Sequence, residues 1–275
     1  MTFAADLHTH STASDGQYTP SELVALAKKC GIEVLALTDH DTLDGLEEAV
    51  RAGKELGLRI IRGIELSARE YHTFHILGYN VNPEAPKLAA LCREMKDSRD
   101  QRSLRIIDFL KEKGIVIDLA GVEALAGGKI VGRPHFAQAL TRYGYVSSNR
   151  EAFDRYLDTE EFHRRIERPK PPVRTCIEAI KAAGGKVSLA HPYQIGIDGP
   201  ALESLVRELA DCGLDAIECH YPKYTPEQEA FYLHLAEKYG LHVTGGSDFH
   251  GERVKPDVPL AAWPLELEWI TAGDK

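Results

Sequence analysis

The sequence predicts an α/β fold, a closed or nearly closed barrel of seven strands with a helical insertion after the fourth strand. Two observations predict it. Short apolar, β-branched runs alternate with capped helical stretches, and between about residues 83 and 172 this alternation gives way to a purely helical pattern. A chain of 275 residues is long enough for one large domain or for one domain that carries an insertion.

Seven runs have the length and composition of buried strands. They are Phe3–Leu7, Val34–Leu37, Arg59–Leu66, Phe74–Asn80, Lys186–Ala190, Ala216–Cys219 and His242–Gly245. Polar residues fall mainly at the ends of these runs. In barrels and open α/β sheets the catalytic and ligand-binding residues lie at strand ends.

Three of the intervening stretches begin with a capping box, in which a threonine is followed three residues later by Glu or Gln. The boxes start at Thr19, Thr175 and Thr225, and the helices that follow are expected to end at Gly31, Gly184 and Gly240. Strands that alternate with capped helices imply βαβ units and a mostly parallel sheet.

The insertion is predicted from four helical segments without a strand between them. They are Lys87–Lys113, a shorter segment around Val122, Pro134–Arg142 and Arg150–Leu157. We therefore expect a barrel domain formed by residues 1–98 and 175–275, and a helical lid or substrate domain over residues 99–174.

Composition excludes several classes of protein. The five cysteines form no CxxC pair and are odd in number, which argues against a disulfide framework and favours a reducing compartment. We find neither a signal peptide nor a membrane-spanning run, so a cytoplasmic protein without membrane contact is expected. The net charge of −9 counts against binding of duplex nucleic acid. The basic segment Phe162–Arg174 fits either an anion pocket or a solvated loop.

Histidine and aspartate cluster after the apolar runs. The clusters are Asp6-Leu7-His8-Thr9-His10, Thr38-Asp39-His40-Asp41, His75, Ala190-His191-Pro192 and Ser247-Asp248-Phe249-His250. A single His-x-His pair is weak evidence for a metal, because such histidines often satisfy hydrogen bonds in a core. Many imidazoles combined with a few carboxylates indicate a multinuclear site for zinc, manganese or iron rather than calcium.

The ordered elements DLHTHS, SDG, TDHD, GxE, HxLG, AHP and SDFH resemble the PHP (polymerase and histidinol phosphatase) superfamily. Within it, the chain is similar to stand-alone phosphoesterases that act on nucleoside 3′,5′-bisphosphates and on the 5′ ends of short RNA. The resemblance extends over nearly the whole chain. It implies a distorted (β/α)7 barrel of the PHP type with a helical insertion domain.

The same resemblance implies three divalent metal ions, of manganese, zinc or iron. The implied ligands are His8, His10, Glu65 and Asp248 for the first metal, Glu65, His75 and His191 for the second, and Asp15, His40 and His250 for the third. Glu65 also stands out by itself, because it is a carboxylate at the end of an apolar strand. His72 competes with His75, and the HxLG pattern favours His75.

Three divalent cations outweigh the charge of the carboxylates Asp15, Glu65 and Asp248, so the site would stay positive and attract phosphate. Metal-bound water would supply a hydroxide nucleophile, and no side-chain nucleophile is required.

The segment Gly132-Arg133-Pro134-His135-Phe136 is a second candidate for contact with substrate. Arginine binds phosphate through a planar fork, and a helix that starts near Pro134 would present its N-terminus to an anion. In the resembled enzymes an Arg and a His at this place contact substrate phosphate. Arg133 and His135 are therefore expected to bind substrate, and His135 to protonate the leaving oxygen.

We predict a metal-dependent phosphoesterase for small phosphorylated substrates. It would remove the 3′-phosphate of nucleoside 3′,5′-bisphosphates, cleave short RNA from its 5′ end, or both. One alternative is a phosphatase for a small monoester such as histidinol phosphate, and another is an inactive metal-binding PHP domain. C–N hydrolysis is a third, which is disfavoured because no lysine ends a barrel strand.

Overall fold

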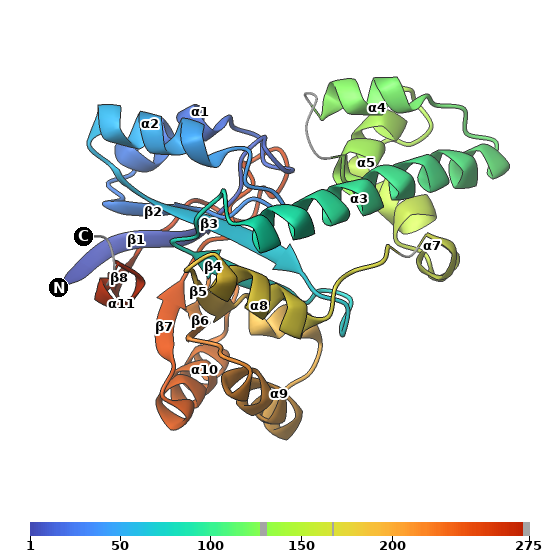
Figure 1. Ribbon diagram of the computed structural model, residues 1–275. Helices are drawn as coiled ribbons and strands as arrows, with labels where there is room; N and C mark the ends of the chain where they lie inside the picture. Colours follow the sequence, from blue (N-terminus) through green and yellow to red (C-terminus); the bar gives the residue numbers. More distant parts are fainter. Residues whose placement is uncertain (127–130, 167, 272–275) are drawn as a thin grey trace. The chain divides into compact units, whose positions relative to one another are not determined.

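The computed structural model describes residues 1–126, 131–166 and 168–271. The chain divides into two compact units, which we call the barrel unit (Met1–Cys92 with Lys170–Lys275) and the insertion unit (Arg93–Pro169). Figure 1 shows both units, and each is described by itself. The domain boundaries expected from the sequence stay predictions.

The barrel unit is built on one sheet of eight strands in the order β7-β6-β5-β4-β3-β2-β1-β8. The strands are β1 Thr2–Thr9, β2 Val34–Leu37, β3 Arg59–Ser67, β4 His75–Tyr79, β5 Lys186–Leu189, β6 Ala216–His220, β7 His242–Gly245 and β8 Trp263–Glu266. All seven strands expected from the sequence are therefore present. The sheet is mixed, since β4 runs antiparallel to both β3 and β5.

The sheet curls until its two sides nearly meet, which confirms the α/β barrel. The backbone N–H of His10 donates to the carbonyl of Phe249 at 2.9 Å, and that of Asp248 donates to the carbonyl of His8 at 2.8 Å. These bonds join β1 to the segment that follows β7. The eighth strand, β8, pairs antiparallel with β1 and was missed because it contains Pro264, which argues against a strand.

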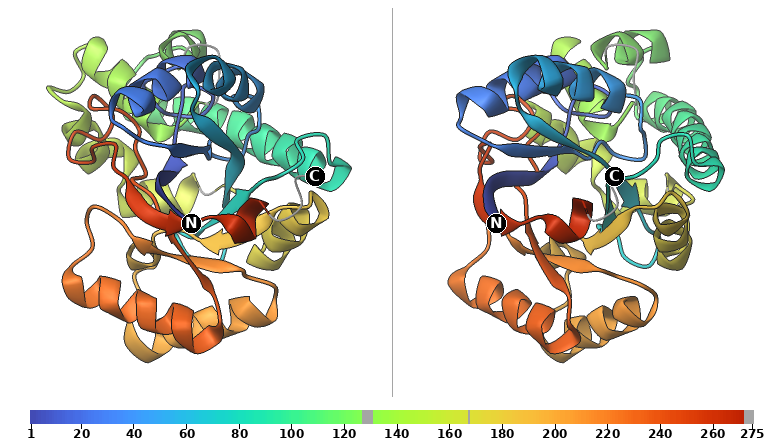
Figure 2. Two further views of the ribbon diagram at one scale, coloured as in Figure 1. Left: turned by 90° about the vertical axis from the view of Figure 1, so that its left-hand side faces the viewer. Right: turned by 60° about the vertical axis from the view of Figure 1, so that its left-hand side comes forward.

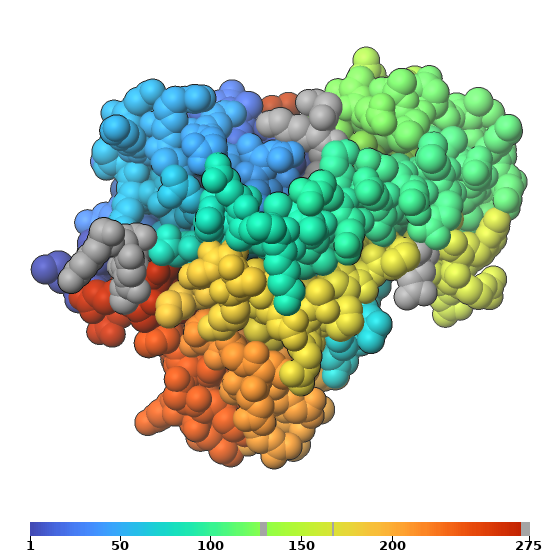
Figure 3. All heavy atoms as spheres, in the orientation of Figure 1, coloured from blue at the N-terminus to red at the C-terminus, as the bar shows by residue number. Residues whose placement is uncertain are grey.

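Helices lie on the outside of the strands (Figure 2). They are α1 Pro20–Lys29, α2 Leu46–Leu56, α8 Val173–Ala182, α9 Gly199–Asp211, α10 Pro226–Tyr239 and α11 Glu268–Thr271, with a 3-10 turn, η2, at Pro192–Ile195. In the space-filling view of Figure 3, α8, α9 and α10 lie next to one another on one face of this unit. Apolar side chains of the strands, such as Leu7, Ala36 and Leu77, form its core.

Two of the three predicted capping boxes are confirmed. Thr19 accepts a hydrogen bond from the backbone of Glu22, and Thr225 accepts one from Gln228. The third prediction is wrong, because α8 begins at Val173 and Thr175 lies inside its first turn. The reason is a long-range cap, since the carboxylate of Glu70 accepts from the backbone N–H of Val173 at 3.0 Å.

The described residues of the insertion unit form helices joined by loops and contain no strand. Its helices are the distal part of α3 (Pro86–Glu112), α4 Leu119–Leu125, α5 Arg133–Arg142, α6 Asn149–Ala152, the π-helical turn η1 Phe153–Leu157, and α7 Glu160–Arg165. They pack around their own buried apolar cluster, which includes Phe109, Phe136 and Phe162. The basic segment is thus not a solvated loop throughout, since its first residues belong to α7. None of the described helices of the protein is long and apolar enough to cross a bilayer.

Candidate metal centre

The histidines and carboxylates predicted as ligands in the barrel unit all lie at one end of its strands. His8 and His10 come from the end of β1, and Asp248 follows β7. His75 is the first residue of its strand, yet it belongs to the same end because β4 runs antiparallel to β3 and pairs His75 with Ser67. The topology therefore brings together residues that are up to about 240 positions apart in the sequence.

Glu65 lies at the centre of this cluster and is fully buried. Its two oxygens divide five imidazoles between them. Oε1 lies 2.7 Å from Nδ1 of His75 and 3.0 Å from Nε2 of His191, and Oε2 lies 2.9 Å from Nδ1 of His40, 3.2 Å from Nε2 of His10 and 3.3 Å from Nε2 of His8. One carboxylate thus contacts two separate sets of histidines, which is the arrangement that a bridging ligand requires.

Asp248 faces the same histidines through one of its oxygens. Its Oδ1 lies 3.4 Å from Nε2 of His10 and 3.7 Å from Nε2 of His8. The other oxygen, Oδ2, accepts from Nζ of Lys255 at 2.7 Å and from the hydroxyl of Tyr221 at 3.2 Å. Lys255 and Tyr221 therefore fix which oxygen of Asp248 is left for a metal.

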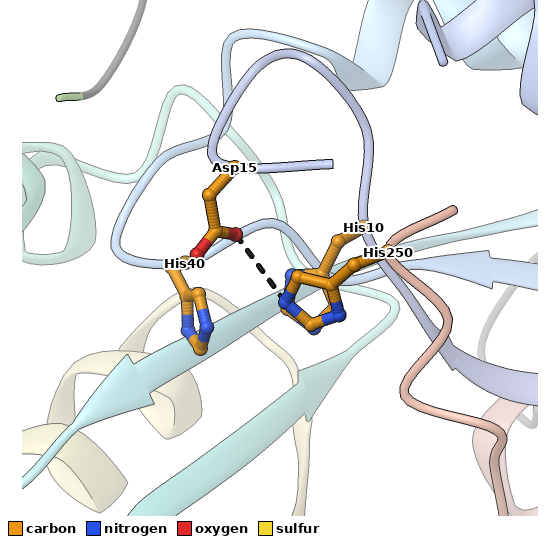
Figure 4. Close-up of side chains that lie close together, drawn as sticks. All are labelled: His10, Asp15, His40 and His250. Carbon is orange, nitrogen blue, oxygen red and sulfur yellow. Dashed lines mark ion pairs between the residues drawn. The ribbon is translucent and has the colours of Figure 1, made fainter. Parts of the chain in front are cut away.

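A further group lies beside these residues and is drawn in Figure 4. It consists of His10, Asp15, His40 and His250, whose potential ligand atoms all lie within 4.8 Å of one another. Asp15 Oδ1 is 3.3 Å from Nε2 of His250, and the rings of His10 and His250 stack with their centroids 4.0 Å apart. His10 thus contacts this group as well as Asp248, whereas the resemblance placed it with the first metal alone.

The donor set fits divalent metal ions. Several buried polar atoms of the cluster lie close to one another but form no hydrogen bond of acceptable geometry among the described residues, which is costly unless something else satisfies them. They are Nε2 of His8, both ring nitrogens of His10, Oδ1 of Asp15, Oε2 of Glu65 and Nδ1 of His191. Imidazole and carboxylate donors that converge on shared points are the ligands of zinc, manganese and iron.

The pKa shifts of most of these groups favour the deprotonated forms that bind metal. Burial lowers the pKa of His75 to about 3 and, together with the charge of His10, that of His250 to about 4, so both rings are neutral at pH 7. Burial by itself would raise the pKa of Glu65, but the surrounding histidines hold it well below the ordinary value. His8 is the exception. Against the effect of burial, Glu65, Glu218 and Asp248 raise its pKa well above the ordinary value.

Three buried carboxylates that are not proposed ligands support the cluster, and of these only Glu218 was missed by sequence reasoning. Glu218 on β6 lies 3.1 Å from Nδ1 of His8. Asp6 accepts from the backbone and hydroxyl of Ser247, and burial raises its pKa to about 7. Asp39 accepts from the backbone and hydroxyl of Ser11. A charged residue inside an apolar strand, as at Glu218, was the available signal.

The two residues expected to bind substrate lie in the insertion unit, at the start of α5. Nδ1 of His135 accepts from the backbone N–H of Gly132 at 2.9 Å, which caps the helix, and His135 is buried. Arg133 donates to Oδ1 of Asp158 at 2.7 Å and to the carbonyl of Leu157. Both side chains are thus held by local contacts, and their roles toward substrate stay predictions. His72, the competitor of His75, is exposed.

Comparison with known proteins agrees with the fold and the cluster. The model of the PHP domain family matches residues 6–159. The chain is 38% identical over 251 residues to a 5′-3′ exoribonuclease of Haemophilus influenzae, covering 91% of both chains. It is 35% identical to a phosphoribosyl 1,2-cyclic phosphate 1,2-diphosphodiesterase of Eggerthella lenta, covering 90% of this chain and 94% of that one. It is 31% identical to a 3′,5′-nucleoside bisphosphate phosphatase of Chromobacterium violaceum, covering 89% and 86%.

Among solved structures, one from Bifidobacterium adolescentis superposes with a TM-score of 0.86 at 30% identity, covering 98% of this chain and 95% of that one. That protein is proposed to be a metal-dependent phosphoesterase. A barrel with a buried His, Asp and Glu cluster at one end of its strands defines a metal-dependent hydrolase. The chain belongs to the PHP domain family, and within that family it is a phosphoesterase.

Proposed function

We propose that this phosphoesterase hydrolyses phosphate from nucleotides at a centre of three divalent metal ions. Its reactions are removal of the 3′-phosphate of nucleoside 3′,5′-bisphosphates, 5′-end exonucleolytic cleavage of short RNA, or both. The observation that carries the proposal is Glu65, whose two oxygens face separate sets of imidazoles at 2.7 to 3.3 Å. The names of the Haemophilus influenzae and Chromobacterium violaceum relatives support the choice of substrate.

The proposed ligands are those expected from the sequence. They are His8, His10, Glu65 and Asp248 for the first metal, Glu65, His75 and His191 for the second, and Asp15, His40 and His250 for the third. In the structure Glu65 lies both with His8 and His191 and with His40 and His75, so the groups of neighbouring ligand atoms overlap between these sets. Bound divalent ions would polarise the phosphate and acidify water at the site. Manganese, zinc and iron all suit this donor set.

The remaining tasks fall to the protein's own side chains. Glu218 holds the ring of His8 through Nδ1 and so leaves Nε2 directed toward Glu65. Lys255 and Tyr221 hold Asp248 with Oδ1 toward His10. Arg133 would bind a substrate phosphate through its guanidinium, and His135 would donate a proton to the leaving oxygen.

The cysteines support a reducing compartment, which for this protein we propose to be the cytoplasm. All five are free thiols, and two of them, Cys176 and Cys219, are buried.

A substrate comparison tests the proposal. The manganese-loaded protein is incubated with adenosine 3′,5′-bisphosphate, a 5′-phosphorylated RNA oligomer, histidinol phosphate and phosphoribosyl 1,2-cyclic phosphate, and the release of phosphate and nucleotide is measured. We expect the highest kcat/KM with one of the first two. A preference for either of the last two would overturn the assignment of substrate. Elemental analysis that finds less than about one metal per chain would overturn the metal centre.

A further inference from the structure

A cavity of about 550 Å³ opens beside the metal centre, within the barrel unit. Side chains of aromatic, amide and charged type line it, among them Tyr193, Gln194, Tyr221, Lys223, Lys255 and Asp257. This volume is in the range of sites that bind small molecules. Aromatic and charged groups that line the same cavity suit a polar ligand with a flat apolar part.

Two of the lining residues contact a proposed metal ligand directly. Lys255 and Tyr221 both donate to Oδ2 of Asp248, whose other oxygen faces His8 and His10. The backbone makes a second connection, because Tyr193 lies two residues after His191 on the 3-10 turn η2. A ligand in the cavity therefore lies next to the point where the scissile phosphate would bind.

Tyr193 is held as a rigid aromatic wall of this cavity. Its ring centroid lies 5.3 Å from that of Tyr221 and 5.6 Å from that of Tyr224. Tyr224 is itself fixed, since its hydroxyl donates to the carbonyl of Glu218 at 3.1 Å. Tyr193 is half-buried, so its aromatic surface is partly open. Every nucleobase has a flat π-face that can stack on such a ring.

The cavity also contains a cation that its neighbours do not neutralise. Lys255 is paired with Asp248, whereas Lys223 is exposed and forms no ion pair within 4.0 Å among the described residues. Asp257 is the acidic residue of the lining. An ammonium group beside an aromatic wall suits a ligand that carries both a base and a phosphate.

Building on the proposed function, we propose that this cavity holds the nucleoside part of the substrate. The base packs against Tyr193, and Lys223 faces the phosphate that is not cleaved. The scissile phosphate then lies at the metals beside Asp248. The cavity thus selects nucleotides over phosphoesters that lack a base.

Equilibrium binding tests the stacking. Adenosine 5′-monophosphate and ribose 5-phosphate are titrated calorimetrically into the manganese-loaded protein. The Tyr193→Ala variant should weaken binding of adenosine 5′-monophosphate relative to ribose 5-phosphate about 10-fold, as expected for loss of one stacked base. Tyr193→Phe should keep the wild-type ratio because it keeps the ring. Tyr239→Ala is the matched control, since Tyr239 lies at the end of α10 and bonds to Glu203.

Steady-state kinetics test the lysine. Lys223→Ala should raise the KM for adenosine 3′,5′-bisphosphate about fivefold relative to that for adenosine 3′-monophosphate, which lacks the second phosphate. Lys54→Ala, on the exposed face of α2, is the control. If the wild type hydrolyses nucleotides but Tyr193→Ala and Lys223→Ala match their controls, the inference is wrong and the proposed function stands. If the wild type releases no phosphate from nucleotides, the proposed function itself is wrong.

Discussion

Glu218 connects β6 to two of the proposed metal ligands. Its Oε1 lies 3.1 Å from Nδ1 of His8, and its Oε2 accepts from the backbone N–H of His191 at 2.6 Å. All three residues are buried. A carboxylate behind a metal-binding imidazole sets the ring orientation and raises its basicity. Glu218 therefore fixes the positions of His8 and His191 without being a proposed metal ligand itself.

Replacing Glu218 with glutamine should weaken manganese binding about 10- to 100-fold, because the neutral amide gives His8 less support. The affinity can be measured by competition with a chelator. Glu229→Gln is a matched control, since Glu229 contacts Nδ1 of His220 at 2.6 Å, outside the metal cluster. Equal affinities of the two variants would contradict the supporting role.

Replacing Glu65 with glutamine should remove at least one metal per chain and lower kcat/KM by about 100-fold or more, because an amide cannot supply two anionic oxygens to a shared site. Elemental analysis and nucleotide hydrolysis measure the two effects. Circular dichroism shows whether the variant is folded. A folded variant with the wild-type metal content would exclude Glu65 as a bridge.

Metal affinity should rise with pH, because a metal must displace a proton from His8. The carboxylates around His8 raise its pKa well above 6.5, so the metal-free ring holds a proton at neutral pH. His75 and His250, with a pKa of about 3 and about 4, have no proton to lose. Manganese titrations between about pH 6 and 8 give the slope. A slope of zero would contradict this assignment.

Gly246→Ala should damage the metal centre as well as the fold. An added Cβ would lie 2.7 Å from the backbone nitrogen of His8 and 2.8 Å from Oε1 of Glu218. Gly185→Ala is the control, because its Cβ would meet Val81 and Ile180 instead. Both should lose about 1–3 kcal/mol of unfolding free energy. Only Gly246→Ala should also bind manganese more weakly, and similar metal affinities in both variants would show that His8 does not shift.

Arg133→Ala should raise the KM for adenosine 3′,5′-bisphosphate about 10-fold, since a guanidinium that binds phosphate is lost. Arg155→Ala is the control in the insertion unit, where Arg155 pairs with Glu151. An unchanged KM would favour a substrate with a single phosphate, such as histidinol phosphate.

The sequence by itself determined the class of fold and the end of the barrel that carries the chemistry. Strand formation depends on local apolar and β-branched composition, and all seven predicted strands are present. Two of them, β2 and β7, have the predicted bounds. Most candidate ligands lie at or just after the ends of these strands, so their placement at one edge was accessible to the same reasoning. His75 is the exception, because only the antiparallel direction of β4 brings the first residue of that strand to this edge.

The tertiary structure decided what depends on contacts between distant segments. The start of α8 is set by Glu70, more than 100 residues earlier, and Asp248 owes its orientation to Lys255 and Tyr221. In the sequence Glu218 is only a single charge in an apolar strand. The fold places it against His8, 210 positions away. Local propensity cannot encode such partners, because the register of the sheet chooses them.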